Sequence, residues 1–155
     1  MARKQSPEQF MRAIDREIKS MPYKLKLFFM EAARTAEEER RKGFAGGYGP
    51  NGEKWKPLAE STIKRKRRKK YKDPEKPLLA KGTLSKGRIG ANTKRGIVRL
   101  WESREDISEY HEKGGRGNKP PKRSHFGIYK QAERKIRLSF KRFIESFAKR
   151  LARGR

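Results

Sequence analysis

Apolar side chains are concentrated in a few segments of this 155-residue chain, and this distribution limits where a core can form. Charged residues make up 40% of the sequence and apolar residues only 32%, a balance that approaches that of disordered proteins. The apolar residues nevertheless gather near the two ends and in the middle of the chain. We therefore expect one folded domain of ordinary size whose core comes from those segments, with basic loops around it.

Two helices are predicted within residues 1–43. The stretch Ser6-Pro7-Glu8-Gln9 has a capping serine, a proline suited to the first helical position and a glutamine that completes a capping box. Met21-Pro22 is expected to end this helix, and a second helix should run from about Pro22 to Arg41 and stop at Lys42-Gly43. Apolar residues recur at helical spacing in both helices: Phe10, Ile14 and Ile18, then Leu25, Phe28, Phe29, Ala32, Ala33 and Ala36.

Residues 44–128 are predicted to be a loop-rich region with a small antiparallel β element. Phe44 to Pro57 has too many glycines and prolines for a regular element, and Pro50-Asn51-Gly52 within it is a strong turn signal. The stretch Gly96 to Trp101 is rich enough in β-branched and aromatic residues to form a strand. Ile107 to His111 is expected to be another short strand or a turn.

A long amphipathic helix is predicted from about Tyr129 to Ala152, within a C-terminal segment of residues 129–155 that ends in a basic tail. Its apolar stripe is expected to face the core rather than a partner: Ile136, Phe140, Phe143, Ile144, Phe147 and Leu151. Helices at both ends and a β region between them correspond to an α+β fold in a single domain, residues 1–155.

Several classes of function are disfavoured by the composition. The chain has no cysteine, which excludes disulfides, thiol nucleophiles and cysteine-based zinc sites. Its two histidines, His111 and His125, do not have metal-ligand spacing, and the glycine-rich loops do not match a phosphate-binding loop. His111 beside Glu112 could act as a general base, but no nucleophile is marked in the sequence. We expect no enzyme activity, no metal or cofactor, and no membrane segment, because no apolar run approaches about 20 residues.

The charge balance indicates an affinity for polyanions. The chain has 44 Lys and Arg residues against 18 Asp and Glu residues, a net charge of +26. Binding of DNA or RNA through phosphates is expected for such a chain, and a non-specific nucleic-acid-binding protein is an alternative function. One run holds the candidates for DNA contact, although a run of like charge is equally typical of a solvated segment: Lys64, Arg65, Lys66, Arg67, Arg68, Lys69 and Lys70.

Short sequence boxes follow one another in a fixed order after the second predicted helix. A Gly-Gly loop precedes Pro50 to Leu58 (Pro-Asn-Gly-Glu-Lys-Trp-Lys-Pro-Leu), then Ser61 to Lys66, then Leu78 to Leu84 (Leu-Leu-Ala-Lys-Gly-Thr-Leu). This ordered set resembles the phage virion morphogenesis family, which includes tail-completion proteins. Two later boxes of the family are also recognisable, at Ile107 to Gly115 and at Pro121 to Ile128, with substitutions at Ile107, Ser108, Lys122, Ser124 and His125.

The resemblance implies a structural protein of a tailed bacteriophage or prophage. Such a protein completes or terminates the tail, or joins the tail to the head at the neck. It would assemble with copies of itself into a ring, expected to be a hexamer, and contact other tail or neck proteins and the phage DNA that passes through the ring. Its location would be the virion tail or neck, and the host cytoplasm during assembly. Ten residues of the family boxes would define the fold and its loops: Trp55, Leu58, Leu79, Gly82, Leu84, His111, Gly114, Gly115, Arg123 and Gly127.

Overall fold

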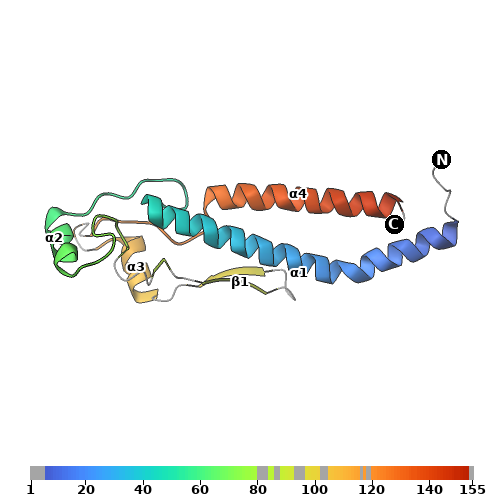
Figure 1. Ribbon diagram of the computed structural model, residues 1–155, viewed down its shortest axis with the longest axis horizontal. Coiled ribbons are helices and arrows are strands. Elements are labelled where there is room, and N and C mark those ends of the chain that lie inside the picture. Colours follow the sequence, from blue (N-terminus) through green and yellow to red (C-terminus); the bar gives the residue numbers. More distant parts are fainter. Residues whose placement is uncertain are drawn as a thin grey trace.

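A computed structural model describes residues 6–79, 84–85, 88–92, 97–101, 105–115, 117 and 120–153 of the chain. Six elements follow one another in these residues: α1 (Pro7–Gly46), α2 (Glu60–Arg68), β1 (Arg88–Asn92), β2 (Ile97–Trp101), α3 (Glu105–Lys113) and α4 (Lys130–Arg153). Figure 1 shows that α1 and α4 lie side by side and form a long arm, with α2 and α3 gathered at one end of it.

The α+β class predicted from the sequence is wrong, because the chain is mainly helical. Its described helices have 40, 9, 9 and 24 residues, whereas β1 and β2 have only five residues each. The two strands pair as an antiparallel hairpin, from Arg88 opposite Trp101 to Asn92 opposite Ile97. This hairpin packs along α1 as an accessory and does not form a central β region. A two-stranded hairpin cannot enclose a core, so the apolar residues at helical spacing determine the architecture.

Two local predictions in the middle of the chain also need correction. Ile107 to His111 was expected to be a strand or a turn, but these residues lie within α3. The strand expected at Gly96 to Trp101 corresponds to β2, whereas its partner β1 was not foreseen in a segment that contains Gly90 and polar residues. Strand pairing supplies the order that the sequence of β1 does not indicate by itself.

The two predicted N-terminal helices are a single helix, α1. The capping box is confirmed, since Gln9 N donates to Ser6 Oγ at 3.2 Å and Ser6 N donates to Gln9 Oε1 at 3.1 Å. Pro22 lies inside the helix rather than at its end. Figure 1 shows that α1 is bent in its blue N-terminal part, as expected for a helix that contains an internal proline. The helix continues because its apolar stripe runs unbroken past the proline, through Ile14, Ile18, Met21, Leu25 and Phe28.

The core of the arm lies between the antiparallel helices α1 and α4. Phe28 of α1 packs against Phe140 and Phe143 of α4, with ring centroids 5.3 and 5.7 Å apart. Two ion pairs join the helices near their ends, Lys135 Nζ to Glu39 Oε1 at 2.7 Å and Arg150 Nε to Glu17 Oε2 at 3.1 Å. The predicted C-terminal helix is confirmed, but its apolar stripe is only partly buried: Phe140 and Ile144 keep 45% and 44% of their surface exposed.

Candidate functional site

The family-box residues meet at the C-terminal end of α1, around Trp55. The ring of Phe44 packs edge-to-face against Trp55, with centroids 5.4 Å apart, and Trp55 Nε1 donates to the carbonyl of Ser124 at 2.8 Å. Leu84 completes this buried cluster, and three partly buried residues surround it: Leu78, Leu79 and Ile107. Segments that lie far apart in the sequence are therefore fixed to one another through one aromatic side chain.

Arg123 ties the same cluster to the loop before α2. Its guanidinium donates to the carbonyl of Lys56 at 3.0 Å and to the carbonyl of Pro57 at 3.3 Å, and its backbone N donates to the carbonyl of His111 at 2.8 Å. Only 3% of Arg123 is exposed, and this burial lowers the pKa of its guanidinium. The planar guanidinium donates to two backbone carbonyls, which are not reactive groups. Arg123 therefore holds the loop in place and has no catalytic role in this arrangement.

His125 is fully buried and links α3 to the loop before α4. Its Nδ1 lies 3.1 Å from the carbonyl of Arg123, which can only accept, so this nitrogen carries a hydrogen. Its Nε2 lies 3.0 Å from Ser108 Oγ. Glu112 Oε1 lies 3.2 Å from the same Nδ1 and accepts from the backbone N of His125 at 2.5 Å and of Phe126 at 2.6 Å.

Ser108, His125 and Glu112 contact one another in the order found in the catalytic triad of a hydrolase. The burial of Ser108 and His125 excludes catalysis by this set. Ser108 is 5% exposed and His125 is 0% exposed, so a substrate cannot reach either side chain. Every interaction in the set instead holds the loop that leads into α4. In the part of the chain that the structure describes, no three His, Asp or Glu side chains gather closely enough to hold a metal ion.

His111, the candidate base, borders a cavity between α2 and α3. The cavity is lined by apolar and basic side chains, among them Leu58, Arg65, Leu78 and Ile107. His111 Nδ1 is buried and has no hydrogen-bond partner among the described residues. Burial, and then the nearby His125 and Arg123, lower the pKa of His111. The lowered pKa favours the neutral ring at pH 7.

The box glycines of the described residues fit tight backbone turns. Gly114 has a φ of 78°, and a Cβ there would lie 3.1 Å from the backbone N of Lys122. Gly115 N donates to the carbonyl of Pro120 at 2.9 Å, and Gly127 adopts a φ of 131°. Gly82, the remaining box glycine, lies outside the described residues. Positive φ angles therefore account for Gly114 and Gly127, whereas Gly115 takes part in the turn only through its backbone.

The basic run is not one uniform cationic strip. Lys66 is buried, and its Nζ donates to the carbonyls of Asp73 and Lys76 at 3.2 and 2.7 Å. Burial lowers the pKa of Lys66, with Asp73 acting in the opposite direction. Lys64 pairs with Glu60 at 3.1 Å, and Arg67 pairs with Glu75 at 2.6 Å. Four exposed cations remain for which no ion pair is seen in the described residues: Arg65, Arg68, Lys69 and Lys70.

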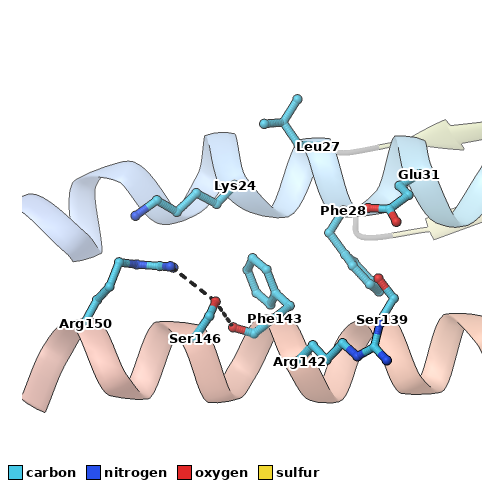
Figure 2. A pocket seen from close by; sticks show the side chains of 9 residues that line it. All are labelled: Lys24, Leu27, Phe28, Glu31, Ser139, Arg142, Phe143, Ser146 and Arg150. Carbon is cyan, nitrogen blue, oxygen red and sulfur yellow. Dashed lines mark hydrogen bonds between the residues drawn. The ribbon is translucent and has the colours of Figure 1, made fainter.

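An open groove runs between α1 and α4, and Figure 2 shows the side chains that line it. Arg150 Nη1 donates to Ser146 Oγ at 3.2 Å, and Ser146 Oγ donates to the carbonyl of Phe143 at 2.9 Å. Lys24 and Arg150 both pair with Glu17, at 2.6 and 3.1 Å, so two of the three cations that line the groove are compensated. These hydrogen bonds to Glu17 lower the pKa of its carboxyl group.

Three buried residues were missed in the sequence, and all of them belong to the group around Trp55, Arg123 and His125 that we call the loop cluster. Arg40 is 1% exposed, donates to the carbonyl of Leu84 at 2.8 Å and places its guanidinium 5.2 Å from the ring centroid of Phe44. Ser108 was noted only as a departure from the family boxes, and His125 as such a departure and as a histidine without metal-ligand spacing. Arg40 precedes Phe44 by one helical turn, and this is the only sequence signal that could have suggested a shared environment.

Comparison with known proteins gives one match. The model of the phage virion morphogenesis family matches residues 6–144, most of the chain. No curated protein and no solved structure matches it. Within the described residues, no helix is long and apolar enough to cross a membrane. The matched range includes α1, the loop cluster and most of α4, so the resemblance seen in the boxes extends to the helices.

Proposed function

Because this chain belongs to the phage virion morphogenesis family and so serves phage virion assembly, we propose that it is a tail-completion protein that works as a ring. The ring would terminate the tail or join it to the head at the neck. The family is one of structural and assembly proteins rather than a known enzyme family. The buried Ser108 and His125 agree with that character, since their hydrogen bonds hold loops together.

One observation supports assembly with other subunits most directly. The described part of this highly charged chain leaves large apolar side chains exposed mainly on its two long helices: Phe10, Met11, Ile18, Tyr23, Leu27, Met30, Leu138, Phe140 and Ile144. Exposed apolar surface of this extent usually marks a surface that binds another protein. A ring requires such surfaces, because each subunit contacts two neighbours.

Imaging of particles made without the protein tests the proposal. The phage or prophage that encodes the chain would be propagated with the gene deleted, and the particles would be examined by electron microscopy. Full heads with separate tails would indicate joining, and overlong or unstable tails would indicate termination. Normal particles in normal yield would contradict the proposal. Native mass spectrometry of the purified protein would give the number of subunits, expected to be six.

Non-specific nucleic-acid binding is a second candidate, supported by the net charge of +26 and the four exposed cations of the basic run. Titration of duplex DNA into the protein at rising salt separates the two functions. Incidental attraction between a basic surface and DNA phosphates weakens steeply as the salt concentration rises, so it should be lost at physiological salt. Tight binding that survives physiological salt, together with normal particles from the deletion, would favour this alternative.

A further inference from the structure

The N-terminal part of α1 carries an apolar stripe that extends beyond the end of α4. Ile14 and Ile18 belong to the same stripe as Phe28, which packs on α4. Arg150, near the end of α4, already pairs with Glu17, so the first turns of α1 lie past the helix that covers the stripe elsewhere. Figure 1 shows this blue end of α1 projecting beyond the C-terminus of α4. Three of its apolar residues are 39%, 57% and 57% exposed: Phe10, Met11 and Ile18.

Helix α4 carries a second apolar stripe, which α1 covers only in part. Phe140, Ile144, Phe147 and Leu151 recur at steps of four, three and four residues, the spacing of a helix that packs against a helical partner. Phe140 touches Phe28 of α1 on one side, yet 45% of its surface is exposed, and Ile144 is 44% exposed. The apolar face of α4 is therefore wider than the part that α1 covers.

We propose that these two stripes bind each other between copies of the chain: the N-terminal stripe of α1 in one copy packs on the second stripe of α4 in the next. The proposal rests on the proposed ring function and names the surface through which the ring would form. Met11 of the α1 stripe and Ile144 of the α4 stripe cannot meet within one chain. With Glu17 beside Arg150 in antiparallel helices, Met11 and Ile144 are separated by about 18 Å along the helix axis. Contact between two different surfaces is the arrangement that closes into a ring.

The charges near the two stripes bear on whether two copies of this strongly basic chain can approach each other through these surfaces. Residues 7–20 of α1 balance three acidic against three basic side chains: Glu8, Asp15 and Glu17 against Arg12, Arg16 and Lys19. Beside the α4 stripe, Arg137 pairs with Glu133 at 2.7 Å and Lys141 lies 4.0 Å from Glu145. The balanced charge of the α1 segment lets it approach the basic helix α4 of a second copy, and it suits DNA less well, because phosphates require cations that lack a local partner.

Disulfide capture tests the pairing directly, because the chain has no cysteine of its own. Two single variants, Met11→Cys and Ile144→Cys, would be purified, one of them with a mass-distinguishable tag, then mixed and oxidised with copper phenanthroline. We expect mixed disulfide dimers, with few dimers from either variant alone. A disulfide needs Cα atoms within about 7 Å, so mixed dimers require the proposed contact. Absence of mixed dimers, or predominance of like pairs, would overturn it.

A non-covalent measurement separates this inference from the ring itself. Ile144→Asp would be compared by native mass spectrometry and sedimentation with the wild type and with Ile128→Asp, a control that is 53% exposed in the loop before α4 and outside both stripes. We expect Ile144→Asp to weaken assembly at least about tenfold with an unchanged circular dichroism spectrum, and Ile128→Asp to assemble like the wild type.

The outcomes distinguish the two proposals. If Ile144→Asp assembles as the wild type does, the surface is wrong while the ring function stands. If the wild type remains monomeric at every concentration tested, or if the Met11→Cys chain couples only to a different virion protein during phage growth, a second copy is not the occupant. The gene-deletion phenotype then decides the proposed function independently.

Discussion

The phenol ring of Tyr129 occupies the space that a side chain on Gly43 would need. A Cβ at Gly43 would lie 2.6 Å from Tyr129 Cζ, closer than such atoms approach in proteins. Tyr129 itself is 2% exposed, and it belongs to the cluster with Ala36 and Ala132 where α1 and α4 begin to pack. The same burial raises the pKa of its hydroxyl group. The absence of a side chain at Gly43 therefore sets the distance between the two helices at this point.

Gly43→Ala is expected to destabilise the protein, although it lies inside a helix. Alanine in a helix interior is normally better than glycine by about 1 kcal/mol. Here the added methyl group must displace a buried ring, and overpacking of this kind costs roughly 1–3 kcal/mol. Urea unfolding followed by circular dichroism would measure the change.

A double-mutant cycle gives the control for this prediction. In a Tyr129→Ala background the ring is absent, so Gly43→Ala should become neutral or stabilising. An equal loss of stability in both backgrounds would show that contact with Tyr129 is not the cause.

Gly43 also shows why the sequence predicted part of the fold and not the rest. A Lys-Gly pair after an apolar run predicts a helix end, but α1 continues to Gly46, and Gly47 makes the left-handed cap with a φ of 71°. The local rule cannot detect a ring that arrives from 86 positions later in the chain. Similarly, Pro22 predicted a helix end that packing overrides, and the helical spacing of α4 was read correctly because it is local.

In the candidate site, too, the sequence predicted what depends on local patterns and not what depends on distant contacts. The order of the boxes pointed to Trp55, Leu84 and Arg123, and the structure places these three residues in one region at the end of α1. Their actual contacts, such as Trp55 with Ser124, join residues far apart in sequence and follow no spacing rule. Buried polar residues such as Arg40 are the hardest to foresee, since burial of a charge depends entirely on distant partners.

Arg123→Ala is expected to reduce the free energy of unfolding by about 1–3 kcal/mol, because the carbonyls of Lys56 and Pro57 lose a charged donor in a buried place. Arg123→Lys should recover only part of the loss, since a single ammonium group cannot reproduce the fork. Lys122→Ala, a change at the exposed neighbour, should shift stability by less than about 0.5 kcal/mol. Urea midpoints would test this, and equal midpoints for Arg123→Ala and Lys122→Ala would contradict it.

Stability should fall as the pH decreases from about 6.5 towards 5, because of His111. The pKa of His111 is lower in the folded protein than its ordinary value, through burial and the nearby His125 and Arg123. As the pH falls, His111 therefore binds a proton in the unfolded chain at a higher pH than in the folded protein. The contribution of neutral His111 to the free energy of unfolding is complete only above about pH 6.5. The carboxyl groups of Glu17 and Glu39, whose pKa values are also lowered, matter only below about pH 4.5.

The variant His111→Asn removes this titration and should flatten the dependence of stability on pH between about 6.5 and 5. Thermal unfolding of the variant and the wild type at several pH values would give the difference between the two slopes. Parallel pH profiles would mean that His111 does not titrate in this range.

Substitutions in the basic run of residues 64–70 should distinguish residues that stabilise the fold from residues that contact DNA. The triple variant Arg65→Gln, Arg68→Gln, Lys69→Gln removes exposed cations, so it should weaken binding to duplex DNA and reduce the slope of log K against log salt by about 2–3 without changing the melting temperature. Lys66→Gln should do the reverse, with a loss of about 1–3 kcal/mol in stability, because Lys66 Nζ supports the carbonyls of Asp73 and Lys76. Fluorescence anisotropy at several salt concentrations and thermal unfolding would measure both effects. If Lys66→Gln lowers the salt slope as much as the triple variant does, Lys66 contacts phosphate in the complex and the division fails.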